Sequence, residues 1–418
     1  MTAQGKSIDS ARSASHGLQA ECDVPNRLLE SAERLFALAK AGAPRRRVEL
    51  YARATIRVRA RREASDVTIL DTGRDEGLAV RTQDEHGRVR FAAASGIEPA
   101  AMRVALAGAT GDPGIRIALP WQTGGRGVQS DHAASGPSPG SEDLERWLRE
   151  CAPAGRPAWV ESGRTVETLV ADGGLLATRT RDRVWAVAMV DRAGEERPRI
   201  VAGRTLDRLD PAGLAPSPYP GMSPIDVRDV PRHLPWIAEP ADAAILVQDL
   251  VTALCGPEAG ASVPVGRGFS VTEDPHTILG LAGGSFDDAG FPTRVNLLTD
   301  QGFTIPVARG PGSYRRDSFR DPPHVGFGTL VVPDGTDELP EDAIRIEGLR
   351  VSRLAPDRWN LEFGGVYIAH GSPARSLVPT GVTIRPVELV RRIRGAVGTA
   401  RTCSNGVVTP ILILDPLV

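Results

Sequence analysis

Apolar and polar residues alternate strictly in one stretch of the N-terminal region. From Val48 to Ala60 every even position is apolar, and the odd positions are Glu49, Tyr51, Arg53, Thr55, Arg57 and Arg59. A period of two indicates a β-strand with one face on a core and one face in water. We therefore predict one long strand with a solvated, cationic face. Arg53 and Arg57 on that face are candidates for lining a substrate chamber or an interface.

Helices and shorter strands are predicted on both sides of this strand. Apolar residues at helical spacing predict helices over Pro25–Ala43 and Ile97–Ala109. Between them, short strands are expected at Val67–Leu70, Leu78–Thr82 and Val89–Ala94. Residues 26–112 thus form an N-terminal α+β layer with antiparallel strands, and residues 1–25 form a polar, flexible tail.

The remainder of the chain is expected to be rich in strands. Residues 113–140 collect Gly, Pro and Ser and are predicted to be a surface loop or linker. A helix over Ser141–Cys151 then opens a β-rich middle unit, residues 141–216, which we interpret as an antiparallel meander. A Pro-rich connector at 217–235 leads into residues 236–418, an irregular β-sandwich or barrel. The predicted fold class is α+β.

Composition restricts the classes of function. The 418 residues are 24% charged with a formal net charge of −2, which argues against global disorder and against a basic nucleic-acid binder. No apolar run reaches the ~18–20 residues that cross a bilayer, and the first 25 residues are polar. We expect a cytoplasmic protein with neither nucleic-acid nor membrane partners.

Motifs for catalysis or metal binding are missing from the sequence. The seven histidines are spread so that no two lie within ten residues, and no Walker loop, GxGxxG or GxSxG is present. The sequence therefore predicts no catalytic residue. Cys403 is a candidate metal ligand only if other ligands lie near it. Asp287 and Asp288 are adjacent carboxylates beside glycine, which is typical of a turn. They remain candidates for the chamber or interface.

Several segments in collinear order resemble the TldD/PmbA family, whose paired members are also called TldD and TldE. In the N-terminal unit these segments are Glu76–Arg81, the Asp84–Gly87 turn and Val89–Ser95. In the C-terminal unit they are Val271–Pro275, Phe286–Thr293, Leu298–Phe303, Gly348–Val351, Phe363–Gly365, His370–Gly371 and Val397–Gly398. The resemblance covers most of residues 27–418 and diverges most at 110–140 and 305–325.

The resemblance implies a division of labour between two subunits. TldD-type members carry an HExxxH helix and a C-terminal Cys that together bind metal, whereas TldE (PmbA) members lack the motif and pair with them. The equivalent stretch here, Ala244–Pro257, contains no His, and Gly256 and Pro257 are expected to end its helix. The resemblance thus implies a non-catalytic TldE/PmbA-like subunit without a cofactor of its own. Its heterodimer partner would be a TldD-like, HExxxH-containing metallohydrolase that holds the zinc.

The resemblance also implies a substrate and raises one candidate ligand. Pairs of this family act on peptides, including modified natural-product precursors, so a peptide or amide substrate is expected. The segment Cys403–Pro410 is similar to the active subunit's C-terminal segment, in which the Cys binds metal. A thiolate alone is a poor zinc site, because zinc needs about three protein ligands.

Two other hypotheses stay open at this point. The chain could be a self-sufficient hydrolase that uses Cys403 with a distant histidine, His370 or His324. It could also be a binding module without a hydrolase partner. Zinc content and activity of the chain alone and with its partner separate the first of these from the subunit hypothesis.

Overall fold

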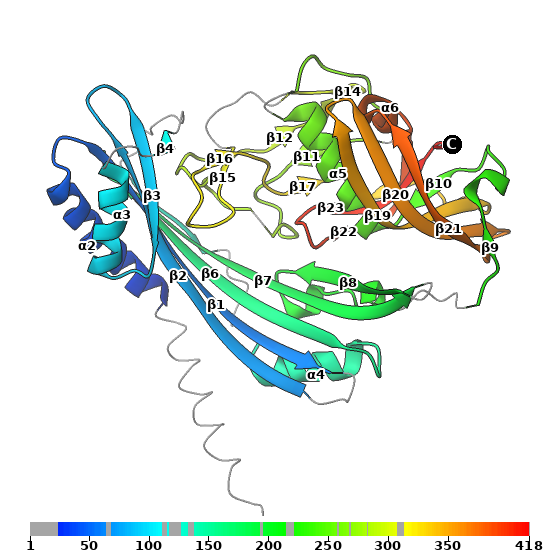
Figure 1. The fold of residues 1–418 in the computed structure, drawn as a ribbon, viewed down its shortest axis with the longest axis horizontal. Helices are drawn as coiled ribbons and strands as arrows, with labels where there is room; N and C mark the ends of the chain where they lie inside the picture. The colour runs from blue at the N-terminus through cyan, green and yellow to red at the C-terminus, as the bar shows by residue number, and fades with distance from the viewer. Residues whose placement is uncertain are drawn as a thin grey trace, which may run out of the picture.

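The chain folds into two β-sheet units that face each other (Figure 1). The computed structural model describes residues 24–63, 68–110, 115–116, 127–132, 138–192, 195–214, 221–256, 259–266, 269–281, 283–306 and 313–417. Within these residues, one sheet has eight strands and the other has eleven, with two further two-stranded sheets. No helix among the described residues has the length and apolar character that crossing a bilayer requires.

The N-terminal sheet is a continuous, curved layer. Its strands are β1 (Arg47–Arg62), β2 (Thr68–Gln83), β3 (Val89–Ser95), β4 (Ile115–Arg116), β5 (Gly127–His132), β6 (Ala158–Ala171), β7 (Leu175–Arg192) and β8 (Glu195–Gly203). The order is β4-β3-β2-β1-β6-β7-β5, and β8 also pairs with β7. The pairing is antiparallel except between β5 and β7, which run parallel. The β1 strand lies in the middle because both β2 and β6 pair along its length.

Helices cover the convex face of this sheet. They are α2 (Val24–Gly42), α3 (Pro99–Thr110) and α4 (Ser141–Cys151). The apolar even positions of β1 pack under α2 and α3 at one end, with Leu50 and Leu35 fully buried. At the other end Leu144 and Leu148 of α4 pack on the even positions of β6 and β7. The odd positions therefore point to the concave face, as the period of two requires.

The C-terminal unit wraps a sheet around one helix, α5 (Pro240–Cys255). Its longer strands are β19 (Ala343–Ala355), β20 (Arg358–Ala369), β21 (Ser372–Ile384), β22 (Ile393–Thr402) and β23 (Val408–Leu414). Short strands complete it: β9 (Pro224–Ile225), β10 (Trp236–Ala238), β11 (Thr272–Glu273), β12 (Asn296–Leu297), β13 (Thr299–Asp300), β14 (Phe303–Thr304), β15 (Tyr314–Arg315), β16 (His324–Val325), β17 (Leu330–Val331) and β18 (Gly335–Thr336). The remaining helical elements of this unit are α6 (Pro386–Arg391) and the 3-10 turn η3 (Val227–Asp229). Two further 3-10 turns, η1 (Leu206–Arg208) and η2 (Pro211–Leu214), pack on the N-terminal sheet beside β8.

The core of the C-terminal unit forms around α5. Leu246, Leu250 and Val251 of this helix pack against the strands, together with Trp236 and Trp359. The helix begins at a proline and ends at Cys255, with Gly256 as its C-cap. The predicted end of this helix at Gly256 is therefore confirmed.

The α+β class is confirmed. The structure also relates the units predicted from the sequence to one another. The units 26–112 and 141–216 share one sheet, because β1 pairs with β6 over its whole length. The predicted linker 113–140 contributes β5 to the sheet's edge. The predicted connector 217–235 packs into the C-terminal core through Val230 and Leu234. The predicted tail lies, up to residue 23, outside the described residues.

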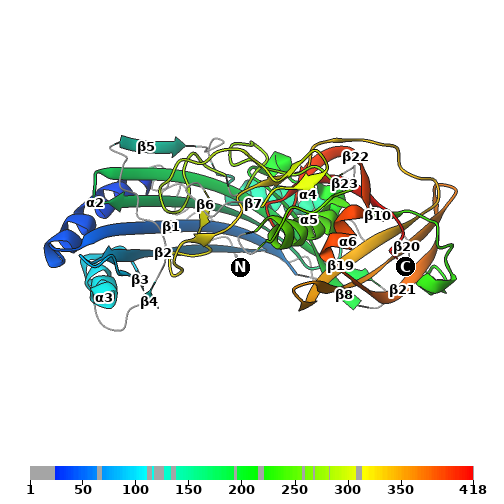
Figure 2. The ribbon, with the colours of Figure 1, turned by 90° about the horizontal axis from the view of Figure 1, so that it is seen from above.

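Loops of the C-terminal unit approach the concave face of the N-terminal sheet. Figures 1 and 2 show the segments around β15 and β16 over the middle of the sheet. Phe286 and Phe319 from these loops pack with Tyr51, Phe91 and Leu169 in a core between the units. The expected solvated face of β1 is thus only partly correct, because Glu49 and Tyr51 are buried beneath these loops.

Candidate functional site

A pocket of about 220 Å³ opens on the concave face of the N-terminal sheet. Its lining comes from the four central strands β2, β1, β6 and β7: Arg53, Thr55, Arg57, Asp75, Gly163, Thr165, Arg183 and Trp185. Both arginines predicted from sequence are among them. Ligand sites commonly lie between packed units, so this pocket is the candidate functional site.

Strand register and glycine make the hollow. Arg57 lies opposite Gly73 on β2 and Gly163 on β6. Gly163 in turn lies opposite Arg183 on β7. Because neither glycine carries a side chain, no cross-strand side chain stands directly beside Arg57 in this row. In the next row, Thr55 and Thr165 share a hydrogen bond of 3.0 Å between their hydroxyl oxygens.

Two backbone carbonyls of the C-terminal unit border the pocket. Arg53 donates from Nη1 to the carbonyl oxygen of Asp317 at 3.2 Å. Arg183 donates from Nη2 to the carbonyl oxygen of Ser404 at 2.8 Å, and its guanidinium carbon lies 4.8 Å from the centre of the Trp185 ring. The pocket therefore lies beside the turn that contains Cys403, a position that sequence alone did not indicate.

A buried ionic network closes one end of the pocket. Asp288 of the C-terminal unit accepts from Arg179 of β7, which also donates to Glu167 of β6. The hydroxyl of Tyr51 donates to the other oxygen of Glu167 at 2.6 Å. Burial would raise the pKa of Glu167, but the charges of Arg179, Arg181 and Arg53 hold that pKa well below its usual value. The carboxylate stays ionised and keeps the arginines in place.

A second buried network joins the same loop to β1. Glu49 accepts from Arg81 of β2 at one oxygen and from Arg316 at the other. Arg316 also donates to the backbone oxygen of Asp288 at 3.2 Å and stacks 4.6 Å from the centre of the Tyr51 ring. The two networks thus fix Asp288 and Arg316, and the described segments around them, against the sheet.

Asp287 and Asp288 have separate structural roles. Asp287 accepts from the backbone N–H groups of Ala289, Phe291 and Tyr314 at 2.9–3.1 Å, which is the turn role that the sequence favoured. Burial raises the pKa of Asp287. Asp288 has its pKa lowered: burial opposes ionisation, but Arg179 and Arg181 outweigh it. Both carboxylates are buried, so neither lines the open pocket.

The region expected for a metal site by family resemblance does not offer zinc ligands. Helix α5 and the turn at Cys403 are adjacent, but Asn405 bridges them by donating to Gln248 Oε1 at 2.6 Å and to the Ala244 carbonyl oxygen at 3.1 Å. The Cys403 thiol donates to the carbonyl oxygen of Pro240 at 3.2 Å. Burial, aided by the charge of Asp242, raises the pKa of Cys403 to about 12. Among the described residues this thiol has no set of further ligands around it, and a lone thiol does not fit zinc, which needs about three protein ligands.

Neither His370 nor His324 is placed to complete a site with Cys403. His370 lies in the turn between β20 and β21 and His324 lies in β16, and both are exposed whereas Cys403 is buried. Among the described residues, no group of three His, Cys, Asp or Glu side chains is arranged to hold a metal ion. The geometry does not support a hydrolase that uses Cys403 with either histidine.

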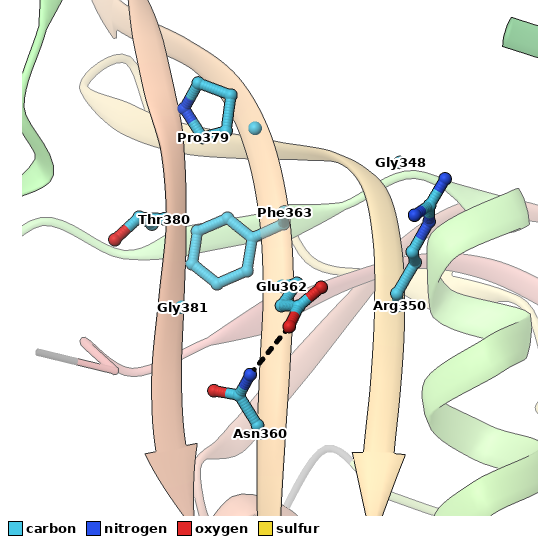
Figure 3. Close-up of a pocket in the computed structure, with 9 residues that line it drawn as sticks. Gly348, Arg350, Asn360, Glu362, Phe363, Pro379, Thr380 and Gly381 are labelled. Atoms are coloured by element: carbon cyan, nitrogen blue, oxygen red, sulfur yellow. Dashed lines mark hydrogen bonds between the residues drawn. The ribbon is translucent and has the colours of Figure 1, made fainter.

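A second pocket of about 320 Å³ lies on strands β19, β20 and β21 (Figure 3). It opens where bulges interrupt the pairing, near Gly348 and Gly364. Its polar side chains are Arg350, Asn360, Glu362 and Thr380, and Asn360 donates to Glu362 at 2.9 Å. The lining includes no imidazole or thiol, and nothing in it pairs an acid with a base for catalysis.

Sequence reasoning missed the β7 side of the arginine pocket. Arg179, Arg181, Arg183 and Trp185 occupy odd positions of one long strand and point to the concave face. The sequence predicted only an antiparallel meander over this region, which does not give the register of β7 on β6. That register places Arg183 opposite Gly163.

Solved structures share this fold over nearly the whole chain. The structure of TldE from Thermococcus kodakarensis matches with a TM-score of 0.72 at 15% identity, covering 93% of this chain and 99% of that one. A proposed modulator of DNA gyrase from Bacteroides thetaiotaomicron matches with a TM-score of 0.67 at 14% identity, covering 92% and 97%. A proposed gyrase modulator from Thermotoga maritima matches with a TM-score of 0.65 at 15% identity, covering 92% and 98%.

Sequence comparisons give no further match. No protein-family model matches the chain, and no curated protein matches it. The structural likeness establishes the fold, and it is the fold that the TldD/PmbA resemblance implied.

Proposed function

We propose that this chain is a non-catalytic, TldE-like subunit that pairs with a TldD-like zinc hydrolase. The observation that carries the proposal is the region around α5 and Cys403, in a fold shared with TldE. There Asn405 bonds Gln248 and the Cys403 thiol bonds a backbone oxygen, and no set of three metal-ligating side chains is present among the described residues. A subunit built this way contributes shape and binding, and the zinc of the partner activates the water.

An exposed apolar edge on the C-terminal unit supports association with another subunit. Val295, Leu297 and Phe303 are 52%, 57% and 50% exposed. They lie on neighbouring segments, because Ile305 donates its N–H to the carbonyl oxygen of Leu298 at 2.8 Å. Contiguous exposed apolar side chains are typical of protein interfaces. We assign this edge, defined by Val295, Leu297, Phe303 and Ile305, to the partner contact.

The proposed role in catalysis is to complete a substrate chamber. The concave face with its arginine pocket is the part of this chain with the chemistry to hold a substrate. A peptide or a peptide-like amide suits it, because its carbonyl and carboxylate oxygens accept from guanidinium groups. The complex would work in the cytoplasm on a peptide or natural-product precursor.

Co-expression tests this function directly. The chain is produced with a TldD-like subunit encoded beside it, and the complex is purified through a tag on this chain. We expect a stoichiometric heterodimer that hydrolyses peptides, and loss of activity when Glu in the partner's HExxxH motif is changed to Gln. Peptide hydrolysis that survives this change, or failure of the two chains to associate, would overturn the proposal.

A further inference from the structure

Three arginines around the pocket form no ion pair or hydrogen bond with a carboxylate among the described residues. Among the described residues, Arg57 has no ion pair or hydrogen bond, and Arg53 and Arg183 donate only to the backbone oxygens described above. The chain otherwise pairs its arginines readily: Arg59, two residues along β1, bonds Glu161 at 2.6 Å. An unpaired cluster of like charges is costly to assemble, so it indicates an anionic ligand.

The acidic content of the pocket does not neutralise this cluster. Asp75 is the one carboxylate in the lining, and its Oδ1 lies 3.9 Å from Nη2 of Arg320. Glu167 acts on Arg53 through its charge, and Glu161 acts on Arg183 in the same way, but these two carboxylates are hydrogen-bonded to other arginines. The guanidinium groups at the pocket therefore still have donors for an anionic ligand. The hydroxyls of Thr55 and Thr165 add two neutral donors at its floor.

The pocket of about 220 Å³ has room for a small anion. Arg57 leans over Gly73, since a methyl group added there would lie 3.7 Å from its Nε and Nη2 atoms. A methyl group added at Gly163 would lie 3.7 Å from Cγ of Arg57, an ordinary contact, so the floor beside Arg57 is free of side-chain atoms there. Arg183 is held in position by the Trp185 ring and the Ser404 carbonyl. Guanidinium groups bind carboxylates through two parallel hydrogen bonds.

We propose that this arginine pocket binds a carboxylate group of an acidic peptide. The carboxylate belongs either to an Asp or Glu side chain of the peptide or to its C-terminus. Identifying the ligand as a peptide rests on the proposed function. The binding itself belongs to this chain and needs no partner. In a complex, the pocket would anchor an acidic position of the substrate at a fixed distance from the partner's zinc.

Binding of fluorescent peptides to the full chain alone tests the inference. The probes are hexapeptides with two central Glu residues, with both changed to Gln, and each with a free or an amidated C-terminus. We expect the Glu peptides to bind at least about 10-fold more tightly than the Gln peptides if side chains supply the carboxylate. If the C-terminus supplies the carboxylate, the peptides with a free C-terminus should instead bind more tightly than the amidated peptides. Raising the salt concentration should weaken binding.

Charge-matched variants locate the site. Arg57→Gln and Arg183→Gln should each weaken binding about 10-fold, because each removes one charged donor. Arg146→Gln removes the same charge from helix α4 on the convex face, where Arg146 is exposed, and should change the affinity less than about 2-fold. Arg57 is also exposed, so its variant is expected to fold.

The outcomes separate this inference from the proposed function. Equal affinity for all four peptides, or equal loss in the Arg57→Gln and Arg146→Gln variants, would overturn the arginine pocket and leave the subunit role standing. Tight binding of inorganic phosphate with no preference among the peptides would also overturn the carboxylate assignment. Specific peptide binding without formation of a heterodimer would support the pocket and contradict the subunit role.

Discussion

Arg316 of the C-terminal unit places its Nη2 atom 3.2 Å from Oε1 of Glu49 on β1. Both side chains are buried, and Arg81 donates to the other oxygen of the same carboxylate. The pair joins residues 267 positions apart in sequence, and so it couples the two units. Together with the Arg179–Asp288 pair it sets the distance between the concave face and the loop above it.

Removing Arg316 should strongly destabilise this junction. Arg316→Met leaves Glu49 and Asp288 buried with fewer donors, and we expect a loss of about 3–5 kcal/mol. The matched control is Arg320→Met in the same loop, where Arg320 is exposed and the loss should be about 1 kcal/mol or less. Urea unfolding monitored by tryptophan fluorescence measures both. Equal midpoints for the two variants would contradict the role of Arg316.

Gly77 should tolerate no side chain because the loop packs on it. A methyl group added there would lie 2.1 Å from Cε2 of Phe319. Gly77→Ala should therefore cost about 1–3 kcal/mol through overpacking. Gly73→Ala on the same strand meets atoms no nearer than 3.7 Å and serves as the control. Thermal unfolding compares the two, and Phe319→Leu should recover part of the loss in the Gly77→Ala chain. Equal unfolding temperatures for the two glycine variants would contradict this packing of Phe319 on Gly77.

Acid should weaken the junction through Glu167. In the unfolded chain this carboxyl takes up a proton near its usual pKa of 4.5, whereas in the folded chain the neighbouring arginines keep it ionised at lower pH. Stability that is present above pH 4.5 is then lost as the pH falls through the lowered pKa. The lowered pKa of Asp288 makes the folded chain lose stability in acid in the same way. The raised pKa of Asp287 makes the folded chain gain stability in acid, which offsets part of that loss.

Chemical unfolding between pH 3 and pH 6 measures this dependence. The wild-type free energy of unfolding should fall as the pH decreases, and Glu167→Gln should show a shallower slope. Glu167→Gln will also be less stable at pH 6, because Arg179 then lacks a charged partner. The same slope in both proteins would show that Glu167 does not carry the pH dependence.

The thiol of Cys403 should be unreactive. With a pKa of about 12, only about one molecule in 10⁴ carries the thiolate at pH 8. Cys255 is buried with a pKa of about 12 too, whereas Cys151 is half-buried. Alkylation by iodoacetamide, followed by peptide mass spectrometry, should therefore modify Cys151 before Cys255 and Cys403. Rapid alkylation at Cys403 would instead favour the hydrolase hypothesis that uses it.

The exposed apolar edge should control assembly with the partner. Phe303→Asp and Leu297→Asp place a charge where the interface excludes water, so each should weaken the heterodimer at least about 10-fold. Leu354→Asp introduces the same charge at a residue that is 60% exposed on β19 and should leave the affinity unchanged. Analytical ultracentrifugation of mixed subunits gives the dissociation constants. Equal affinities for all three variants would place the contact elsewhere.

Local sequence patterns predicted the elements well but not their long-range partners. The alternation from Val48 to Ala60 located β1 because it reflects burial of one face, and helix α4 was predicted with its observed bounds. The burial of Glu49 could not be predicted, since it depends on Arg316 far along the chain. The pairing of β1 with β6, which merges two predicted units, likewise has no local marker.

Only the part of the candidate site that lies on one strand could be predicted, because the sequence does not show how the strands pair. Arg53 and Arg57 were identified by their period on one strand, and the pocket confirms that they share a face. Arg183 needed the register of β6 with β7, which places it opposite Gly163. Asp287 was correctly interpreted as a turn residue, whereas the ion pair of Asp288 with Arg179 required the folded structure.

The zinc content of the chain before and after assembly tests the central claim most directly. Each protein is dialysed with zinc, freed of loose metal and measured by elemental mass spectrometry. We predict negligible zinc in the chain alone and about one zinc in the heterodimer, since the ligands belong to the partner. Retention of about one zinc by the chain alone, abolished by Cys403→Ala, would contradict the account.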